Sequence, residues 1–149
     1  MKVNILKLNE NAVVPYKTYN SDLCYDVVAT SCEEIAPNVY KYGIGLAFQI
    51  VRDKEDVDAP LKLSIDMRPR SSVWKTGMLL SNGIGTIDED YRGEVSAVFY
   101  HLFPEMPKYE IGDKIAQIKV GIAPTIEFEV VSELTRTDRA DGGYGSTGR

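Results

Sequence analysis

The sequence has few cysteine and histidine residues, which form disulfides or bind metals in small folds, and it has no long apolar run that could cross a membrane. It has two cysteines and one histidine in 149 residues. The cysteines, Cys24 and Cys32, lack CxxC spacing and have no histidine cluster nearby, so we expect free thiols in a reducing, cytoplasmic compartment. No apolar run approaches 18 residues and the N-terminus has no apolar signal segment, so we expect neither a membrane span nor a signal peptide.

Positive charge is also in deficit. Lys and Arg number 17 against 22 Asp and Glu, which gives a net charge of −5. This balance argues against a surface that coats DNA or RNA, although it leaves room for a small anionic ligand held by a local basic cluster. The length predicts one domain, large enough to bury about 68–70% of its unfolded surface without staples.

The abundant pattern is an alternation of apolar and polar residues with a period of two. Such runs, bounded by Gly, Pro, Asn and Asp, predict antiparallel strands, and their frequent punctuation favours a sandwich or barrel over βαβ units. We therefore expect an all-β fold. The strand candidates are residues 3–8, 61–67, 94–102, 114–122 and 126–131.

One short helix and a long tail complete the expected organisation. The helix covers residues 71–76, with Ser71 as its N-cap and Gly77 closing its C-terminal end. After residue 134 no core-facing pattern remains. The sequence thus predicts a β domain over residues 1–134 and a C-terminal arm over residues 135–149.

The segment "GTIDEDYRGE", residues 85–94, places three carboxylates in a turn between two strand candidates. A solvated acidic turn is the plain interpretation, because Asp favours turns. Against it, Ile87 and Tyr91 are apolar neighbours of Asp88, and a carboxylate partly shielded in this way can serve as a general base.

Three further segments carry polar groups with two interpretations each. In "RPRSSV", Arg70, Ser71 and Ser72 stand where a strand meets the short helix, either as a phosphate site at a helix N-terminus or as an ordinary cap. Gln117 interrupts an apolar strand and could simply face outward. Asp26, between Tyr25 and Val27, is either an exposed strand residue or support for a metal's water shell or an arginine.

The C-terminal stretch "RADGGYGSTGR" contains four glycines, one ring, two hydroxyls and two guanidinium groups. Termini of this composition are commonly frayed. Glycine, however, lets the backbone approach a ligand closely, and consecutive N–H groups beside Ser, Thr and Arg make an anion site.

Taken in order, these segments resemble the five motifs of the trimeric deoxyuridine triphosphatases (dUTPases). The matching stretches are "DLCYDVVA", "RPRSSV", "NGIGTIDEDYRGEV", "GDKIAQIKV" and "RADGGYGSTG", which span residues 22–148. The resemblance implies a distorted jelly-roll or β-barrel-like fold (the β-clip) with one short helix and a flexible arm. It also implies hydrolysis of dUTP to dUMP and pyrophosphate by a homotrimer with shared active sites, which keeps uracil out of DNA and supplies dUMP for thymidylate synthesis.

The resemblance also assigns roles to residues. Asp88 matches the aspartate that activates the attacking water, and Mg²⁺ is expected to be bound through the substrate triphosphate, with Asp26 as a possible outer-shell residue. The residues matched to uracil and deoxyribose are Asn82, Gly83, Thr86, Ile87, Tyr91 and Tyr144. Those matched to the phosphates are Arg70, Ser71, Ser72, Gln117, Arg139, Gly145, Ser146 and Thr147.

Three positions depart from the family pattern. Cys24 and Ser72 stand where glycine is usual, and Tyr144 replaces the more common phenylalanine. Two alternatives stay open. One is a dCTP deaminase or bifunctional deaminase of the same fold, with Glu94 as its base. The other is a non-catalytic nucleotide-binding trimer.

Overall fold

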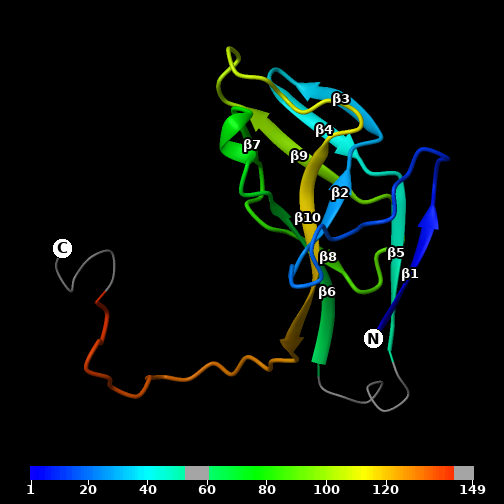
Figure 1. Ribbon diagram of the computed structural model, residues 1–149. Coiled ribbons are helices and arrows are strands. Elements are labelled where there is room, and N and C mark those ends of the chain that lie inside the picture. Colours follow the sequence, from blue (N-terminus) through cyan, green and yellow to red (C-terminus); the bar gives the residue numbers. More distant parts are fainter. Residues whose placement is uncertain (53–60, 143–149) are drawn as a thin grey trace.

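The computed structural model describes residues 1–52 and 61–142, and its regular structure is almost entirely β-strand (Figure 1). In that part of the chain no helix is long and apolar enough to cross a membrane. The strands are Lys2–Lys7 (β1), Tyr25–Val28 (β2), Ser31–Ala36 (β3), Val39–Gly43 (β4), Leu46–Val51 (β5), Leu61–Pro69 (β6), Met78–Leu80 (β7), Gly85–Asp88 (β8), Ser96–His101 (β9) and Lys114–Pro124 (β10).

The strands form three antiparallel sheets. β1 pairs with β5, the second sheet has the order β2-β10-β6-β8, and the third has the order β3-β4-β9-β7. Within the described residues the sheets stay open and do not close into one barrel. The predicted all-β class is confirmed.

The core lies between the sheets and is centred on three aromatic rings. Tyr42, Phe99 and Tyr109 pack edge to face, with ring centroids 5.4–6.3 Å apart. The Tyr42 hydroxyl donates to the Tyr109 carbonyl oxygen at 2.8 Å, and burial raises the pKa of this hydroxyl above its usual value. Burying each ring stabilises the folded state by about 1.5–3 kcal/mol, so this cluster can hold the sheets together without disulfides.

Four of the predicted strands are confirmed to within two residues at each end, as β1, β6, β9 and β10. The fifth, over residues 126–131, is wrong for this chain. β10 ends at Pro124, and Phe128 and Val130 beyond it are 88% and 99% exposed. A strand needs a hydrogen-bonding neighbour, and Figure 1 shows this segment leaving the sheets as an extended trace (orange).

The predicted helix is present but shorter and capped differently. It is a 3₁₀ helix, η1, over Val73–Lys75, and its N-cap residue is Ser72, which makes no side-chain capping bond. The predicted cap by Ser71 is therefore wrong. Gly77 follows with φ +59°, and a Cβ there would approach the Phe103 carbonyl oxygen to 2.9 Å, so a residue with a side chain would be strained.

Candidate active site

A cavity of about 270 Å³ lies beside β8, where the β7–β8 loop and the turn after β8 meet β7 and β9. Of the residues predicted to read uracil and deoxyribose, it gathers Asn82, Thr86, Ile87 and Tyr91, together with Asp88. Gly83 lies in the adjoining loop. The predicted nucleoside-binding residues within the described part of the chain thus converge on one hollow.

The β7–β8 loop positions Asn82 through a tight turn. The Gly83 N–H donates to the Leu80 carbonyl at 3.1 Å, and Gly83 has φ +65°, a region that favours glycine. Gly85 leaves space for the Asn82 side chain, because a Cβ at Gly85 would lie 3.2 Å from the amide nitrogen. The loop therefore holds an amide, one donor and one acceptor, at the edge of the cavity.

Asp88 is the last residue of β8 and lies opposite Ser64 of β6. The turn that follows is closed by the Tyr91 N–H, which donates to the Asp88 carbonyl at 3.1 Å. Ile87 packs against the core as expected, but the Asp88 side chain is exposed. The predicted apolar shielding is therefore incomplete among residues 1–52 and 61–142.

The Tyr91 ring forms another wall. Its hydroxyl donates to the Glu94 carbonyl at 3.2 Å, which ties the ring across the loop. A Cβ at Gly93 would collide with the ring, so glycine is required for this placement. Nearly half of the Tyr91 surface, 48%, stays exposed and available to a ligand.

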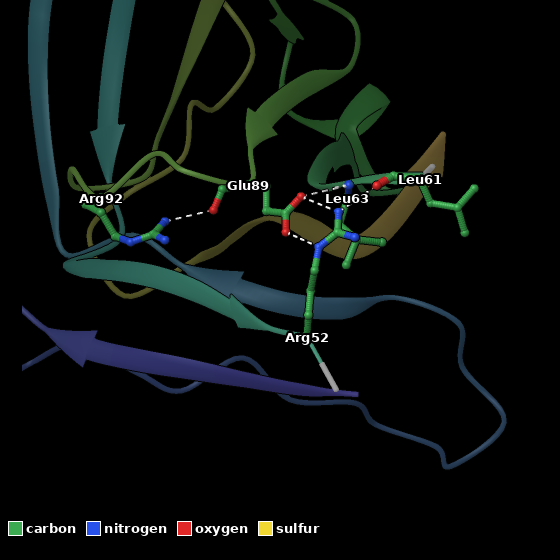
Figure 2. Close-up of polar contacts among 5 residues, drawn as sticks. All are labelled: Arg52, Leu61, Leu63, Glu89 and Arg92. Carbon is green, nitrogen blue, oxygen red and sulfur yellow. Dashed lines mark hydrogen bonds and ion pairs between the residues drawn. The ribbon is translucent and has the colours of Figure 1, made fainter. Parts of the chain in front are cut away.

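The residue after Asp88 belongs to a cluster of polar bonds that sequence reasoning missed (Figure 2). The Glu89 carboxylate accepts from Arg52 Nε at 2.5 Å and Nη2 at 2.8 Å. The hydrogen bond from Arg52, opposed by some burial, lowers the pKa of Glu89 to about 2. Since 36 residues of sequence lie between the partners, no local pattern indicates the pair.

The predicted phosphate-side residues form a second cluster on neighbouring strands. Asp26 of β2 accepts from Arg70 Nε at 3.1 Å and from Lys114 Nζ at 2.9 Å. The bond to Asp26 raises the pKa of Lys114 above its usual value. Gln117 of β10 lies opposite Asp26 and donates to the Pro69 carbonyl at 3.2 Å. The alternative in which Asp26 supports an arginine is the one observed.

These two clusters do not share a cavity in the described part of the chain. Asp26 and Gln117 line a hollow of about 210 Å³ together with Cys24, whereas Arg70 lines a different, more open one. Ser72 is half-buried and Ser71 exposed at the start of η1. Within residues 1–52 and 61–142, one chain therefore does not bring Arg70 or Gln117 to the cavity that Asp88 lines.

The C-terminal segment contributes nothing to either cluster within the described residues. Arg139 is exposed, and its Nε donates to the Gly142 carbonyl at 2.9 Å. The boundary predicted after residue 134 stays a prediction, since the last strand already ends at Pro124. Four predicted ligand residues lie outside the described residues: Tyr144, Gly145, Ser146 and Thr147.

A protein-built metal cage is not found among residues 1–52 and 61–142, where no three His, Cys, Asp or Glu side chains gather closely enough to hold an ion. Asp26 already accepts from two cations. Binding of a magnesium ion through the substrate triphosphate stays a prediction.

Comparison with known proteins assigns the family. The dUTPase family model matches residues 10–148. The deoxyuridine 5'-triphosphate nucleotidohydrolase of Clostridium novyi is 35% identical over 99% of both chains, and that of Nautilia profundicola is 35% identical over the whole of both.

Solved structures agree on the fold. A mutant dUTPase of Staphylococcus bacteriophage 80alpha, determined with dUpNHpp, superposes with a TM-score of 0.80 over 99% of both chains at 20% identity. The dUTPase of phage phi11 of S. aureus superposes with a TM-score of 0.69 over 90% of this chain and 98% of its own. With the family model spanning nearly the whole sequence and relatives above 30% identity along its full length, this chain belongs to the dUTPase family.

Proposed function

We propose that this member of the dUTPase family hydrolyses dUTP to dUMP and pyrophosphate, with Asp88 as the general base that directs a water at the α-phosphorus. The observation that carries the proposal is the cavity beside β8, which brings Asn82, Tyr91 and Asp88 to one hollow. Its volume, about 270 Å³, is near the lower end for small-molecule sites. Such a volume suits a nucleoside whose phosphates extend outward past Asp88.

Base selection would come from the Asn82 amide. Its oxygen and nitrogen can pair with uracil N3–H and O4, whereas cytosine presents the opposite donor and acceptor pattern at those atoms. Each buried polar group left unpaired costs about 1–3 kcal/mol, so the misfit disfavours cytosine strongly. Backbone groups from Gly83 to Ile87 complete the reading and crowd the methyl group of thymine.

Sugar selection would come from Tyr91. The ring is held in place by the bond from its hydroxyl to the Glu94 carbonyl and by its contact with Gly93. A deoxyribose can lie against this ring, while a ribose 2′-OH would collide with it. The site therefore favours deoxynucleotides.

Asp88 would take a proton from the water as the water attacks in line with the leaving pyrophosphate. A positioned general base contributes on the order of 10²–10⁴-fold to rate. The remaining rate acceleration must come from positioning of the reactants and from neutralisation of charge on the phosphates. Mg²⁺ bound through the triphosphate would neutralise part of that charge, and Asp26, already paired with Arg70 and Lys114, would contribute only through a water.

A homotrimer with shared sites accounts for what the single chain leaves apart. The phosphate-side residues, Arg70, Ser71, Ser72 and Gln117, would reach the nucleotide from a neighbouring subunit. Supporting this, residues 125–142 leave the sheets, and their apolar side chains at Phe128, Val130 and Leu134 are at least 84% exposed. Exposed apolar side chains in such a row indicate an interface.

The receiving surface would lie on β1 and its surroundings. β1 is an edge strand of a two-stranded sheet, and an apolar hollow of about 400 Å³ beside it is lined by Val3, Ile5 and Phe48 among others. An edge strand offers free backbone groups to an added strand. Residues 126–131 of a neighbour would supply that strand.

The C-terminal arm would then close over the neighbouring nucleotide. Arg139 would neutralise the γ-phosphate and Tyr144 would stack on uracil. Gly145, Ser146 and Thr147 would contact the phosphates through backbone N–H groups and hydroxyls. Closure of this kind excludes bulk water from the reaction.

We place the enzyme in the cytoplasm, where both free cysteines would stay reduced. There it would remove dUTP from the pool available to DNA synthesis and supply dUMP. The deaminase alternative requires Glu94 as a base. Glu94 does line the cavity, but its Oε1 accepts the Gly45 N–H at 2.8 Å and is committed to holding the fold.

A nucleotide panel tests the proposal. With Mg²⁺, the wild-type protein is expected to release pyrophosphate from dUTP and to turn over dCTP, dTTP and UTP at least about 100-fold more slowly. For dCTP two lost hydrogen bonds suffice for this ratio, whereas dTTP and UTP are disfavoured by crowding at the thymine methyl group and at the ribose 2′-OH. Tyr91→Ala is expected to raise kcat/KM for UTP relative to dUTP. Ammonia released from dCTP would establish the deaminase instead, and no hydrolysis of dUTP would leave a binding protein.

A further inference from the structure

The polar cluster around Glu89 joins three separate parts of the fold (Figure 2). Arg52 directly follows β5, Leu61 and Leu63 belong to the start of β6, and Glu89 directly follows β8. Arg52 Nη2 donates both to Glu89 Oε2 at 2.8 Å and to the Leu61 carbonyl at 2.7 Å. The Leu63 N–H donates to the same Glu89 oxygen at 3.3 Å. The Glu89 side chain is therefore held from two strands at once.

These bonds lie immediately beyond the last residue pair between β6 and β8. Ser64 and Asp88 form that pair, and Glu89 continues the contact with its side chain where the backbone of β8 turns away. Arg92 secures the other side of the turn, since its Nη1 donates to the Glu89 carbonyl at 2.8 Å. Without the Glu89 carboxylate, the bonds from Arg52 and from the Leu63 N–H to this turn would be lost.

The Arg52–Glu89 pair is a partly buried, two-point ion pair that can fix the position of the turn, unlike an exposed ion pair. Both carboxylate oxygens are engaged by nitrogens of one guanidinium, and such two-point pairs fix direction as well as distance. The side chains of Arg52 and Glu89 are only 15% and 26% exposed, which limits screening by solvent. Lysine, a single charged point on a flexible stem, could not make the same set of bonds.

Holding the turn matters because the proposed base is its first residue. The turn is closed by the bond from the Tyr91 N–H to the Asp88 carbonyl, so Asp88 and the sugar-facing ring of Tyr91 move together with it. A displacement of about 1 Å at a reacting group can lower a rate by about 100-fold. Glu89 paired with Arg52 is also kept from acting as a second, misdirected carboxylate beside Asp88.

We propose that Arg52 is a positioning residue for the reaction, acting through its two-point pair with Glu89 to aim the Asp88 carboxylate from the end of β8. This inference rests on the proposed function. It adds a residue that lies outside all five resemblance motifs and does not line the nucleoside cavity.

The test compares Arg52→Gln, Arg52→Lys, Glu89→Gln and the double variant Arg52→Gln/Glu89→Gln in steady-state turnover of dUTP. Each single glutamine variant is expected to lower kcat by about 10–100-fold while KM changes less than about threefold, because the nucleoside cavity stays intact. Arg52→Lys is expected to fall between these variants and wild type. The double variant is expected to lose no more than the worse single one, as for two residues acting as a unit.

A matched control is available on the third sheet. Glu33 and Lys41 are exposed charged residues that lie opposite each other on β3 and β4. Glu33→Gln, Lys41→Gln and their double variant make the same charge changes away from the site, and wild-type kcat is expected. Kinetics are measured at one temperature, below the melting temperatures of wild type and of these control variants.

Amide exchange separates this inference from the proposed function. In Glu89→Gln the Tyr91 amide is expected to exchange at least about tenfold faster than in wild type, whatever the substrate of the enzyme. A wild-type protein inactive on dUTP would defeat the proposed function alone. A kcat within twofold of wild type for both glutamine variants, equal amide protection, or unfolding of all the Arg52 and Glu89 variants at the assay temperature would overturn the positioning role.

Discussion

Three consecutive acidic residues follow Ile87, and the first two, Asp88 and Glu89, have different surroundings. Asp88 is exposed at the rim of the nucleoside cavity and is free to meet a water. Glu89 is bound by Arg52 and the Leu63 N–H. The resemblance assigned Asp88 its role. The sequence could not indicate that Glu89 has a different role, because Arg52, the partner of Glu89, is distant in sequence and lies outside every motif.

The pairing of Glu89 predicts how its contribution to stability depends on pH. Its folded-state pKa, about 2, lies below the usual value of 4.5, so the carboxylate stabilises the fold above about pH 4.5 and loses this effect as the pH falls toward 2. The difference in free energy of unfolding between wild type and Glu89→Gln, measured in urea, is expected to be constant from pH 8 to 5 and to shrink by pH 3.

If the stability difference between wild type and Glu89→Gln does not shrink at low pH, the pairing of Glu89 with Arg52 does not lower the pKa of Glu89. A difference that grows on acidification would mean that Glu89 is held in its protonated form. Glu33→Gln provides the reference, since Glu33 is exposed on β3.

Among the elements, the strands with strong alternation were predictable and the short ones were not. β6 alternates, with Ile65 and Met67 buried, and its period marked it in the sequence. β3 is exposed along its whole length and carries no such signal. β7 has three residues, too few for a period to be read. Their existence depends on pairing with β4 and β9, which is tertiary information.

Residues 126–131 have the alternating pattern of a strand but do not form one in this chain. Its apolar residues alternate as in β6, yet they are exposed in the single chain. The pattern is explained if the pairing partner belongs to another subunit. Local sequence can indicate that a segment will pair, but not with which chain.

This explanation predicts the effect of a charge at Phe128. In an isolated chain Phe128→Asp should be harmless, since the ring is 88% exposed. In a trimer it would bury a carboxylate at the interface, which is strongly unfavourable. We expect sedimentation to shift from trimer to monomer and dUTP turnover to fall by at least tenfold. Glu129→Asn, on the alternate face of the segment, is expected to remain trimeric. A trimeric Phe128→Asp variant would contradict the proposed exchange of segments.

On the scale of the whole molecule, composition and periodicity were enough for the all-β class but not for the arrangement of the site. The residues gathered beside β8 were predicted only through the resemblance of five segments to one family, and the order of strands in the three sheets was not predicted. Even so, Arg70 and Asp88 lie in separate hollows of one chain. Assembly, not sequence or a single subunit, would bring them together.

The net charge of −5 sets a further condition at this scale. An acidic molecule repels a triphosphate at long range, so attraction must arise locally. The basic side chains of Arg70, Lys114 and Arg139 are the candidates for this local reversal. Arg70 and Lys114 already lie together at Asp26, and the field of Arg139 would join theirs where subunits meet.

The most direct test follows the oxygen of the attacking water. In water enriched in ¹⁸O, single-turnover hydrolysis of dUTP by the wild-type protein is expected to place one labelled oxygen in dUMP and none in pyrophosphate. Asp88→Asn is expected to slow this incorporation by about 10²–10⁴-fold while nucleotide affinity stays within tenfold. Label in pyrophosphate, or unchanged incorporation by Asp88→Asn, would contradict attack on the α-phosphorus by a water that Asp88 activates.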